Sequence, residues 1–337
     1  MRRNAFGAQE SDDVSLLTQV ASLYYEENYT QEQIARIIGT SRSGISRLLT
    51  RSRELGLVDI HVHHPLRTSA ILREELIQQF GLQDAQVLLN AATGGLAHSH
   101  TGALAAYYLD RRIQESQIQE GQQIGTIGIS CGPMLLETLK ALRPKRRLPL
   151  NIVQLMGSID RSSYLDIDGP EIARLLAEAY GAHCYYVHAP FFVTDGIVRN
   201  GLLQDLGLRR SFQMMGQMDM AVVAIGGTHP AAPGLFSTGY LKSEESQELC
   251  WQGVIGDICG HFFTLDGKLC ETDASERMIT VPLEALYKTP LVVGVADGAA
   301  KVQAIVGALR AGLVQVLITD EPCARAVLSL AAETSVA

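Results

Sequence analysis

The chain has 337 residues, of which 47% are hydrophobic and 19% are charged, the composition of an ordinary folded protein. No stretch approaches the roughly 20 apolar residues of a membrane-spanning helix, and residues 1–13 lack the apolar core of a signal peptide. The formal net charge of −8 argues against a protein coated in nucleic acid.

The spacing of cysteines and histidines narrows the class further. The six cysteines form no Cys-x-x-Cys pair and have no histidine partners at the spacing of a zinc site. The nine histidines form no His-x-x-x-His pair. We therefore expect reduced thiols in a cytoplasmic protein, with no metal and no cofactor.

Three short helices are predicted in the first sixty residues. Residues 14–28 have the i, i+3, i+4, i+7 spacing of an amphipathic helix. The next helix begins at Thr30, which forms a capping box with Gln33, and ends at Gly39. A third runs from Thr40 or Ser41 to Gly56. The expected buried stripes of the last two helices are Ile34, Ile37, Ile38, Ile45, Leu48, Leu49 and Leu55.

The tight glycine turn between the last two helices predicts a helix-turn-helix, whose second helix enters the major groove of DNA. Five arginines and no acid lie between Gln33 and Arg53, which gives this segment a positive charge inside an acidic chain. The candidate base contacts are Ser41, Arg42, Ser43, Ser46 and Arg47. Arg51 and Arg53 are placed for phosphates, as are Gln31 and the N–H groups beside it. The alternative is a helical cap or dimerisation module with solvated arginines.

The segment that follows is expected to connect two domains, residues 1–65 and 66–337. Residues 55–65 alternate apolar and polar side chains, which predicts a short strand or wing ending at Pro65. An amphipathic helix is expected over 68–82, with Gly81 as its stop and with the apolar stripe Ile71, Leu72, Leu76 and Phe80. This helix would either pair with its twin in a second copy or pack onto its own domain.

From Ala85 onward, strand and helix patterns alternate. The apolar strand patterns lack polar alternation, so the strands are expected to be buried on both faces of a doubly wound, mostly parallel α/β sheet. Asp266-Gly267, after the apolar run 254–263, predicts a local hairpin inserted on that sheet. Strands are expected at 85–89, 124–129, 150–156, 183–189, 220–226, 254–263, 277–281, 291–296 and 314–319, with helices near 96–115, 132–142, 169–180, 204–215, 299–312 and 321–331.

Glycine-rich or polar loops follow six of these strands, at the sheet edge where such folds bind ligands. Asp257 lies in an apolar run, so its carboxylate must find donors, either ligand hydroxyls or a neighbouring loop. Lys301 begins a helical turn and would either bind an anion or remain solvated. The loops are 128–132, 154–160, 189–193, 224–230, 296–301 and 319–321.

One of these loops, Gly128 to Gly132, has the G-x-S-x-G pattern of a nucleophile elbow, with Ser130 at its centre. No histidine occurs from Leu269 to the end of the chain, where a hydrolase of this type would place one. Pro133 suits the first turn of a helix. The loop is therefore predicted to bind rather than react, and no catalytic residue is expected.

Several segments together resemble the SorC-type (DeoR-related) sugar-responsive transcriptional regulators, over about residues 14–331. These segments are LYYEENYTQEQIARIIGTSRSGISRLL at 23–49, GDICGHFFTLDG at 256–267, and the Lys301 helix followed by LITDEPCA at 317–324. The resemblance implies a sugar-sensing domain related to the ribose-phosphate isomerase and glucosamine-phosphate deaminase fold, without catalysis. It also implies a dimer or tetramer and effector-controlled operator binding.

The resemblance also suggests roles for individual residues. It places Tyr24, Gln31 and the third helix on the DNA side. It places Gly128, Gly132, Gln154, Gly157, Asp257 and Lys301 around the effector, and Ser130 and Ser158 belong to the same loops. The sequence departs from the family at Pro133 and Met134, where relatives tend to carry Thr, Arg or Lys and then Thr. Neither side chain can hydrogen-bond a phosphate, so both a phosphorylated and a free sugar or polyol remain open.

The sequence thus predicts a regulator of a carbohydrate or polyol operon that is not an enzyme. A sugar-phosphate isomerase or deaminase with a helical N-terminal extension is the alternative, and it would need an acid–base pair. The available carboxylates, Asp257, Asp266 and Asp320, have no evident histidine partner. A structural oligomerisation protein would leave the glycine-rich edge without a purpose.

Overall fold

The computed structural model describes residues 5–27, 29–58, 66–89, 95–118, 123–159, 168–229, 235 and 240–334, without the side chains of 5–13 and 95–97. The chain divides into two compact units, Met1–Pro65 and Leu66–Ala337. In the described ranges no helix combines the length and the apolar character that crossing a membrane requires.

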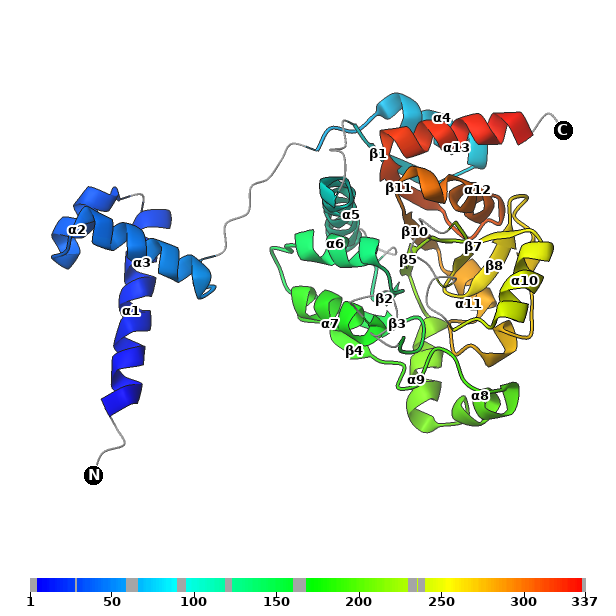
Figure 1. Ribbon diagram of the computed structural model, residues 1–337, viewed down its shortest axis with the longest axis horizontal. Coiled ribbons are helices and arrows are strands. Elements are labelled where there is room, and N and C mark those ends of the chain that lie inside the picture. The colour runs from blue at the N-terminus through cyan, green and yellow to red at the C-terminus, as the bar shows by residue number, and fades with distance from the viewer. Residues whose placement is uncertain are drawn as a thin grey trace. The chain divides into compact units, whose positions relative to one another are not determined.

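The first unit contains α1 (Ala5–Tyr25), α2 (Gln31–Ile38) and α3 (Arg42–Glu54) around a small apolar core (Figure 1). The predicted capping box is confirmed: the Thr30 hydroxyl accepts the Gln33 N–H at 3.3 Å, and Gln33 Oε1 accepts the Thr30 N–H at 2.8 Å. Gly39 ends α2 in the left-handed region at φ +77°, as predicted. Ser41, not Thr40, caps α3.

Two residues of the predicted buried stripes are exposed. Ile37 is 55% exposed and Leu55 is 49% exposed. Ile37 is turned away because α2 meets its neighbours through a narrow face centred on Ile34, and Leu55 follows the last turn of α3. The predicted wing at 55–65 lies mostly outside the described residues, from 59 onward.

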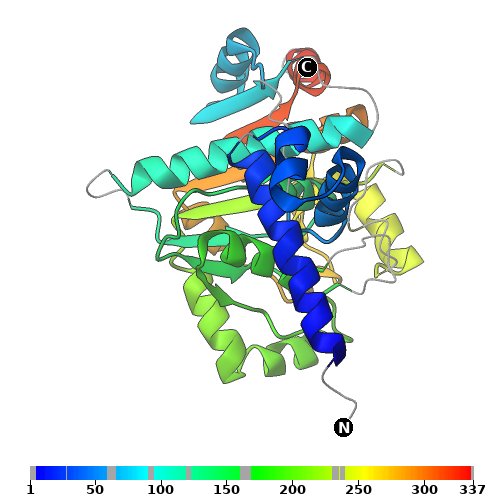
Figure 2. The same cartoon turned by 90° about the vertical axis from the view of Figure 1, so that its left-hand side faces the viewer.

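The second unit is built on a seven-stranded sheet in which every pair of neighbours is parallel. The predicted doubly wound α/β architecture is confirmed, with helices on both faces (Figure 1, Figure 2). In spatial order the strands are β1 (Asp84–Leu88), β11 (Val316–Asp320), β10 (Leu291–Val295), β5 (Met220–Ala224), β2 (Thr126–Ile129), β3 (Asn151–Gln154) and β4 (His183–Tyr185).

Each face of this sheet has its own apolar core. One core is formed with α5 (Gly95–Ser116), α6 (Pro133–Ala141) and α7 (Gly169–Tyr180). The other is formed with α4 (Ala70–Phe80), α9 (Leu206–Met215), α12 (Val302–Arg310) and α13 (Glu321–Thr334). Because both faces are covered, the strands need no polar alternation.

The linker helix α4 packs onto its own unit, against β1 and α13. Leu72 and Leu76 are buried in the core there, at 3% and 0% exposure. Ile71, which the sequence placed on the same stripe, is 72% exposed.

A second, antiparallel sheet contains β6 (Gly226–Gly227), β7 (Val254–Ile258), β8 (His261–Thr264) and β9 (Leu269–Cys270). The run 254–263, predicted as one strand, is therefore two strands. They meet at a two-residue turn, Cys259 at φ +53° and Gly260 at φ +82°. Such a turn requires positive φ at both positions, and within the described ranges Cys259 is the one non-glycine residue that adopts it. The hairpin expected at Asp266-Gly267 forms between β8 and β9.

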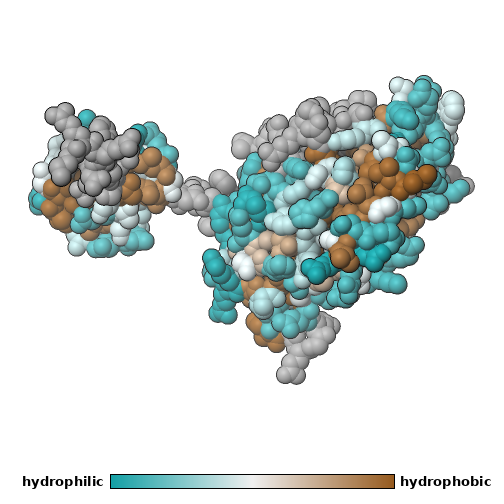
Figure 3. All heavy atoms as spheres, turned by 90° about the horizontal axis from the view of Figure 1, so that it is seen from below, coloured by the Kyte–Doolittle hydropathy of each residue, from teal (hydrophilic) through white to brown (hydrophobic). Residues whose placement is uncertain are grey.

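Three helices were absent from the sequence prediction: α8 (Gly196–Leu202), α10 (Ser243–Trp251) and α11 (Leu283–Lys288). Two of them are too short to show a helical period, and α8 has no buried residue. Figure 3 shows apolar areas on the face that includes α8 and α9, where Ile197 and Leu206 are 85% and 75% exposed. The strand predicted at 277–281 forms only the isolated bridges Met278–Phe192 and Thr280–Met156.

The turn at Gly260 allows a direct stability test. A Cβ there would lie 2.7 Å from Met278 Sδ and 2.9 Å from Phe191 Cζ, whereas one at Gly312, also at positive φ, would meet nothing within 4 Å. We expect Gly312→Ala to lower the free energy of unfolding by about 1 kcal/mol from backbone strain alone. Gly260→Ala should cost about 1–3 kcal/mol more, through overpacking. Urea unfolding followed by circular dichroism measures both, and equal losses would contradict the close contact.

Candidate functional site

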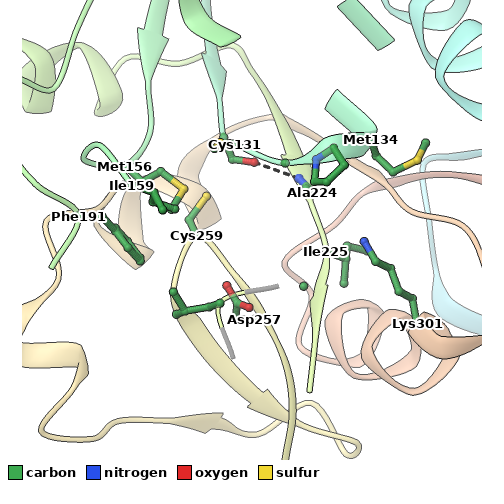
Figure 4. A pocket seen from close by; sticks show the side chains of 15 residues that line it. Cys131, Met134, Met156, Ile159, Phe191, Ala224, Ile225, Asp257, Cys259 and Lys301 are labelled. Atoms are coloured by element: carbon green, nitrogen blue, oxygen red, sulfur yellow. Dashed lines mark hydrogen bonds between the residues drawn. The ribbon is translucent and has the colours of Figure 1, made fainter. Parts of the chain in front are cut away.

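A cavity of about 60 Å³ lies where β2 and β5 end at the carboxyl edge of the main sheet (Figure 4). The β7–β8 hairpin and the first turn before α12 close it from the other side. Figure 4 shows Asp257 and Lys301 entering from these two elements, with Met156, Phe191 and Cys259 on the remaining wall. The cavity is therefore mostly apolar, with a carboxylate and an ammonium group as its charged features.

Ser130 joins two strand ends and is not arranged as a nucleophile. Its Oγ accepts the Ala224 N–H at 3.0 Å, and its own N–H donates to the Val222 carbonyl at 3.0 Å. No histidine lines the cavity in the part of the chain that the structure describes. The loop thus lacks the histidine partner of a Ser-His nucleophile. Gly132 and Pro133 after it begin α6 at the cavity wall.

Asp257 brings a buried carboxylate into this cavity. Its Oδ2 accepts the Gly260 N–H at 3.0 Å, while Oδ1 has no partner among the described residues. A Cβ at position 226 would lie 2.3 Å from Oδ1, so this carboxylate requires the glycine that is there. Burial raises the pKa of Asp257 to about 6, against the opposing effects of the Gly260 N–H and Lys301. A hydrogen-bond donor on a ligand would satisfy the free oxygen.

Lys301 is 8% exposed and is the one buried Lys or Arg in the described ranges, so the solvated alternative is wrong. It ends a short 3₁₀ turn (Ala299–Lys301) from which α12 continues. Burial lowers the pKa of its ammonium group, and the carboxylates of Asp297 and Asp257 oppose that shift. Opposite charges nearby offset part of the cost of burying a cation.

The thiols of Cys131 and Cys259 also line the cavity. Burial raises the pKa of Cys131 to about 12, and burial raises the pKa of Cys259 as well. Both thiols are therefore neutral near pH 7 and act as part of the apolar wall. The structure describes no cluster of metal-ligating side chains.

Four of the eight residues predicted around the effector line this cavity: Ser130, Gly132, Asp257 and Lys301. Gly128 and Gly157 do not, and they instead permit close packing. A Cβ at Gly128 would lie 2.2 Å from Met218 Sδ, and one at Gly157 would lie 2.5 Å from the Pro190 carbonyl oxygen.

Gln154 and Ser158 also support the loops without lining the cavity. The Gln154 amide donates to the Met156 carbonyl at 2.6 Å and accepts the Val187 N–H at 3.1 Å, so both of its polar atoms are used. Ser158 exchanges backbone hydrogen bonds with Ala189 and Phe191. Both positions fasten the end of β3 to the segment after β4.

Sequence reasoning missed Asp297 and His98. Asp297 Oδ1 lies 2.6 Å from His98 Nδ1, while Asp297 Oδ2 has no partner in the described part of the chain. The loop 296–301 was singled out, but only its lysine was assigned a role. His98 lies on α5, 199 positions earlier, and no local pattern connects the two.

In the first unit, four predicted DNA contacts of α3 are exposed: Arg42, Ser43, Ser46 and Arg47. Arg51 is exposed too, with a guanidinium nitrogen 3.9 Å from the Glu54 carboxylate. An ion pair at the exposed surface is weak, so the Arg51 guanidinium could still bind a phosphate.

The other three predicted contacts have structural neighbours. The Ser41 hydroxyl accepts the Gly44 N–H at 3.1 Å and lies 3.0 Å from Ser43 Oγ. Gln31 opens α2 and is half-buried. Tyr24 is half-buried at the edge of the core, edge-to-face with Tyr25 at 4.9 Å between ring centres.

Comparison with known proteins decides the family. Residues 64–329 match the family model of a sugar-binding domain. The sorbitol operon regulator of Klebsiella pneumoniae is 30% identical over 95% of this chain and 99% of its own length. The deoxyribonucleoside regulator of Bacillus subtilis is 31% identical over 93% of this chain and 97% of its own length. The chain belongs to the SorC family of transcriptional regulators.

The fold agrees with this assignment. The crystal structure of the full-length sorbitol operon regulator SorC from Klebsiella pneumoniae matches with a TM-score of 0.68 at 29% identity, over 94% of this chain and 99% of that one. This SorC-family chain is therefore a transcriptional regulator and not an enzyme, and the isomerase or deaminase alternative is set aside.

The raised pKa of Asp257 in this SorC-family protein predicts a pH-dependent stability. The folded chain holds the proton more tightly than the unfolded one, whose value is 3.8. Stability is therefore lost as pH rises from about 4 to about 6, by about 3 kcal/mol at roughly 1.4 kcal/mol per pH unit. Asp257→Asn removes this cost. The free energy of unfolding of the variant minus that of the wild type should therefore increase from about pH 4 to about pH 6 and stay at its higher value above about pH 6.

Urea unfolding of both proteins at pH 4.5, 5.5, 6.5 and 7.5 measures the difference. Asp266→Asn, at an exposed position, is the control for the chemical change from acid to amide. A constant difference for Asp257→Asn would show that its buried carboxylate is not destabilising.

Proposed function

We propose that this regulator binds a small carbohydrate, a polyol or a phosphate ester of one in the cavity at Asp257 and Lys301, and that the bound molecule controls operator binding by α3. The observation that carries the proposal is the buried carboxylate whose Oδ1 lacks a partner in the described ranges, beside a buried ammonium group. A polyhydroxylated ligand supplies hydroxyl donors to the first and acceptors to the second.

The cavity wall suits the same class of ligand. Apolar side chains such as Met156 and Phe191 lie beside the polar groups, and a sugar or polyol carries C–H surface beside its hydroxyls. One of the two relatives is named a sorbitol operon regulator and the other a deoxyribonucleoside regulator. These names support a polyhydroxylated effector for this chain as well.

The first unit supports operator recognition by α3. Its exposed Arg42 and Arg47 project from the N-terminal half of the helix, where a recognition helix meets base edges. An arginine can bind guanine O6 and N7 together, while serines beside it reach bases or phosphates. Tyr24, Gln31, Ser41, Ser43, Ser46 and Arg51 complete the proposed interface.

We place the regulator in the cytoplasm, where its DNA target lies, and propose that it acts as a homodimer or homotetramer. Two copies related by a two-fold axis would present two recognition helices to the half-sites of a palindromic operator. The effector would control binding by having different affinities for two arrangements of these copies.

Arg42→Ala should separate the two units functionally. We expect operator affinity to fall by about 1–3 kcal/mol through loss of a base contact. Arg51→Ala should instead lower the slope of log affinity against log salt by about 0.9, because it loses one phosphate contact. The probe is a duplex selected from a random library by the wild-type protein, with fluorescence anisotropy as the readout. Arg325→Ala, an exposed arginine on α13, is the matched control. Equal effects of Arg42→Ala and Arg325→Ala would contradict the role of α3.

The effector class is tested by the melting temperature of the wild-type protein against pentoses, hexoses, polyols and their phosphates. A ligand at 100 times its dissociation constant adds about 2.7 kcal/mol of stability. A true effector should therefore raise the melting temperature by several degrees. Asp257→Asn should abolish that rise. If no compound raises the melting temperature of the wild-type protein, the sugar-sensing proposal fails.

A further inference from the structure

A second chamber of about 250 Å³ adjoins the cavity. Pro133, Met134 and Lys301 line both spaces, so the lysine stands between them. The remaining walls of this second chamber come from the start of α5, from α6 and from the loop before Lys301. They are formed by His98, Ser99, Leu136, Glu137 and Asp297.

Asp297 gives the second chamber a buried hydrogen-bond acceptor. Its side chain is 2% exposed, and His98 Nδ1 occupies only Oδ1, at 2.6 Å. Oδ2 is buried and has no partner among the described residues. Leaving such an atom unsatisfied is costly, and a ligand donor is the kind of group that would satisfy it.

The second chamber carries a second carboxylate, that of Glu137. Burial alone would raise its pKa, but hydrogen bonds from Lys140 at 2.7 Å and Ser99 at 2.8 Å hold the pKa below its ordinary value. Glu137 is therefore ionised near pH 7. The carboxylates of Asp297 and Glu137 thus both border the second chamber. Within the described ranges, Lys301 is the one buried Lys or Arg.

This arrangement has no positive charge to spare for a phosphate. The carboxylates of Asp297 and Asp257 already stabilise the charged form of Lys301. The neighbouring helix α6 begins with Pro133, which has no N–H to offer at the helix N-terminus. A phosphate placed here would face the carboxylates of Asp297 and Glu137, and the nearby Lys140 is already paired with Glu137.

We infer that the effector extends past Lys301 into the second chamber and is an unphosphorylated polyol or open-chain sugar, one of whose hydroxyls donates to Asp297 Oδ2. The inference rests on the proposed function and narrows its ligand class. Asp257 lines the first cavity, Asp297 lines the second chamber, and Lys301 lines both. Hydroxyls distributed along a carbon chain can donate to both acids while another accepts from Lys301.

The test compares matched pairs: xylitol, ribitol and glucitol, each as the free polyol and as its terminal phosphate ester. Isothermal titration of the full-length wild-type protein should show at least one polyol binding, at least 10-fold more tightly than its ester. Asp297→Asn should lower the affinity for that polyol by about 10- to 100-fold, because a hydrogen bond to a charged acceptor is lost. The same change should raise the affinity for the phosphate ester, because it removes a charge that repels the phosphate.

Glu137→Gln is the matched control in the same chamber. It removes a negative charge but leaves the proposed hydroxyl contact in place. The affinity for the phosphate ester should therefore rise, and the affinity for the polyol should stay the same. Operator binding by each variant without ligand, together with circular dichroism, verifies that it is folded. If Asp297→Asn does not fold, the wild-type pairs and Glu137→Gln still decide the question.

The outcomes separate the two proposals. An ester that binds more tightly than its polyol, or an Asp297→Asn variant with unchanged polyol affinity, overturns this inference and leaves the sugar sensor standing. If neither these pairs nor the wider panel of sugars bind to the wild-type protein, the proposed function fails, and the inference fails with it.

Discussion

The ammonium group of Lys301 is buried, and the carboxylates of Asp297 and Asp257 favour its charged form against the cost of that burial. Removing a single partner of such a group leaves a buried charge without compensation, which is more costly than the net gain from the intact arrangement. The three side chains come from a hairpin, a strand-end loop and the first turn before α12. The cavity therefore depends on the second sheet, which brings Asp257 to the edge of the main one.

The parallel sheet explains why these elements can meet. In a doubly wound sheet all strands deliver their following loops to one edge, so residues far apart in sequence become neighbours there. The Ser130 hydroxyl shows this directly, because it accepts the backbone N–H of Ala224 from the adjacent strand β5. The two hydrogen-bonded strand ends thus form one wall of a cavity that has few polar groups. The antiparallel hairpin brings the carboxylate that the main sheet does not supply.

Local chemistry in the sequence predicted much of this arrangement. The Thr30 capping box, the glycine stop at Gly39 and the buried strands follow from short-range rules, and the structure has them. Asp257, which the sequence singles out because an acid inside an apolar run requires a donor, lines the cavity. Gly128 and Gly157 lie outside that lining, because glycine serves close packing as well as ligand approach, and sequence alone does not distinguish the two uses. Asp297 and His98 were missed because their pairing depends on tertiary structure.

The contact between Gly226 and Asp257 has a stereochemical consequence. The free oxygen of the carboxylate is crowded on one side by the backbone at position 226, where even a methyl group would lie 2.3 Å away. Under the proposed function, a ligand hydroxyl would reach that oxygen from a side other than that of Gly226. Inverting one carbon of such a ligand would then move its hydroxyl away from this oxygen and leave the acid unpaired, a change that a polar site rejects strongly. If the proposed function holds, the glycine that admits the carboxylate would thus give the cavity a means of distinguishing epimers of identical composition and size.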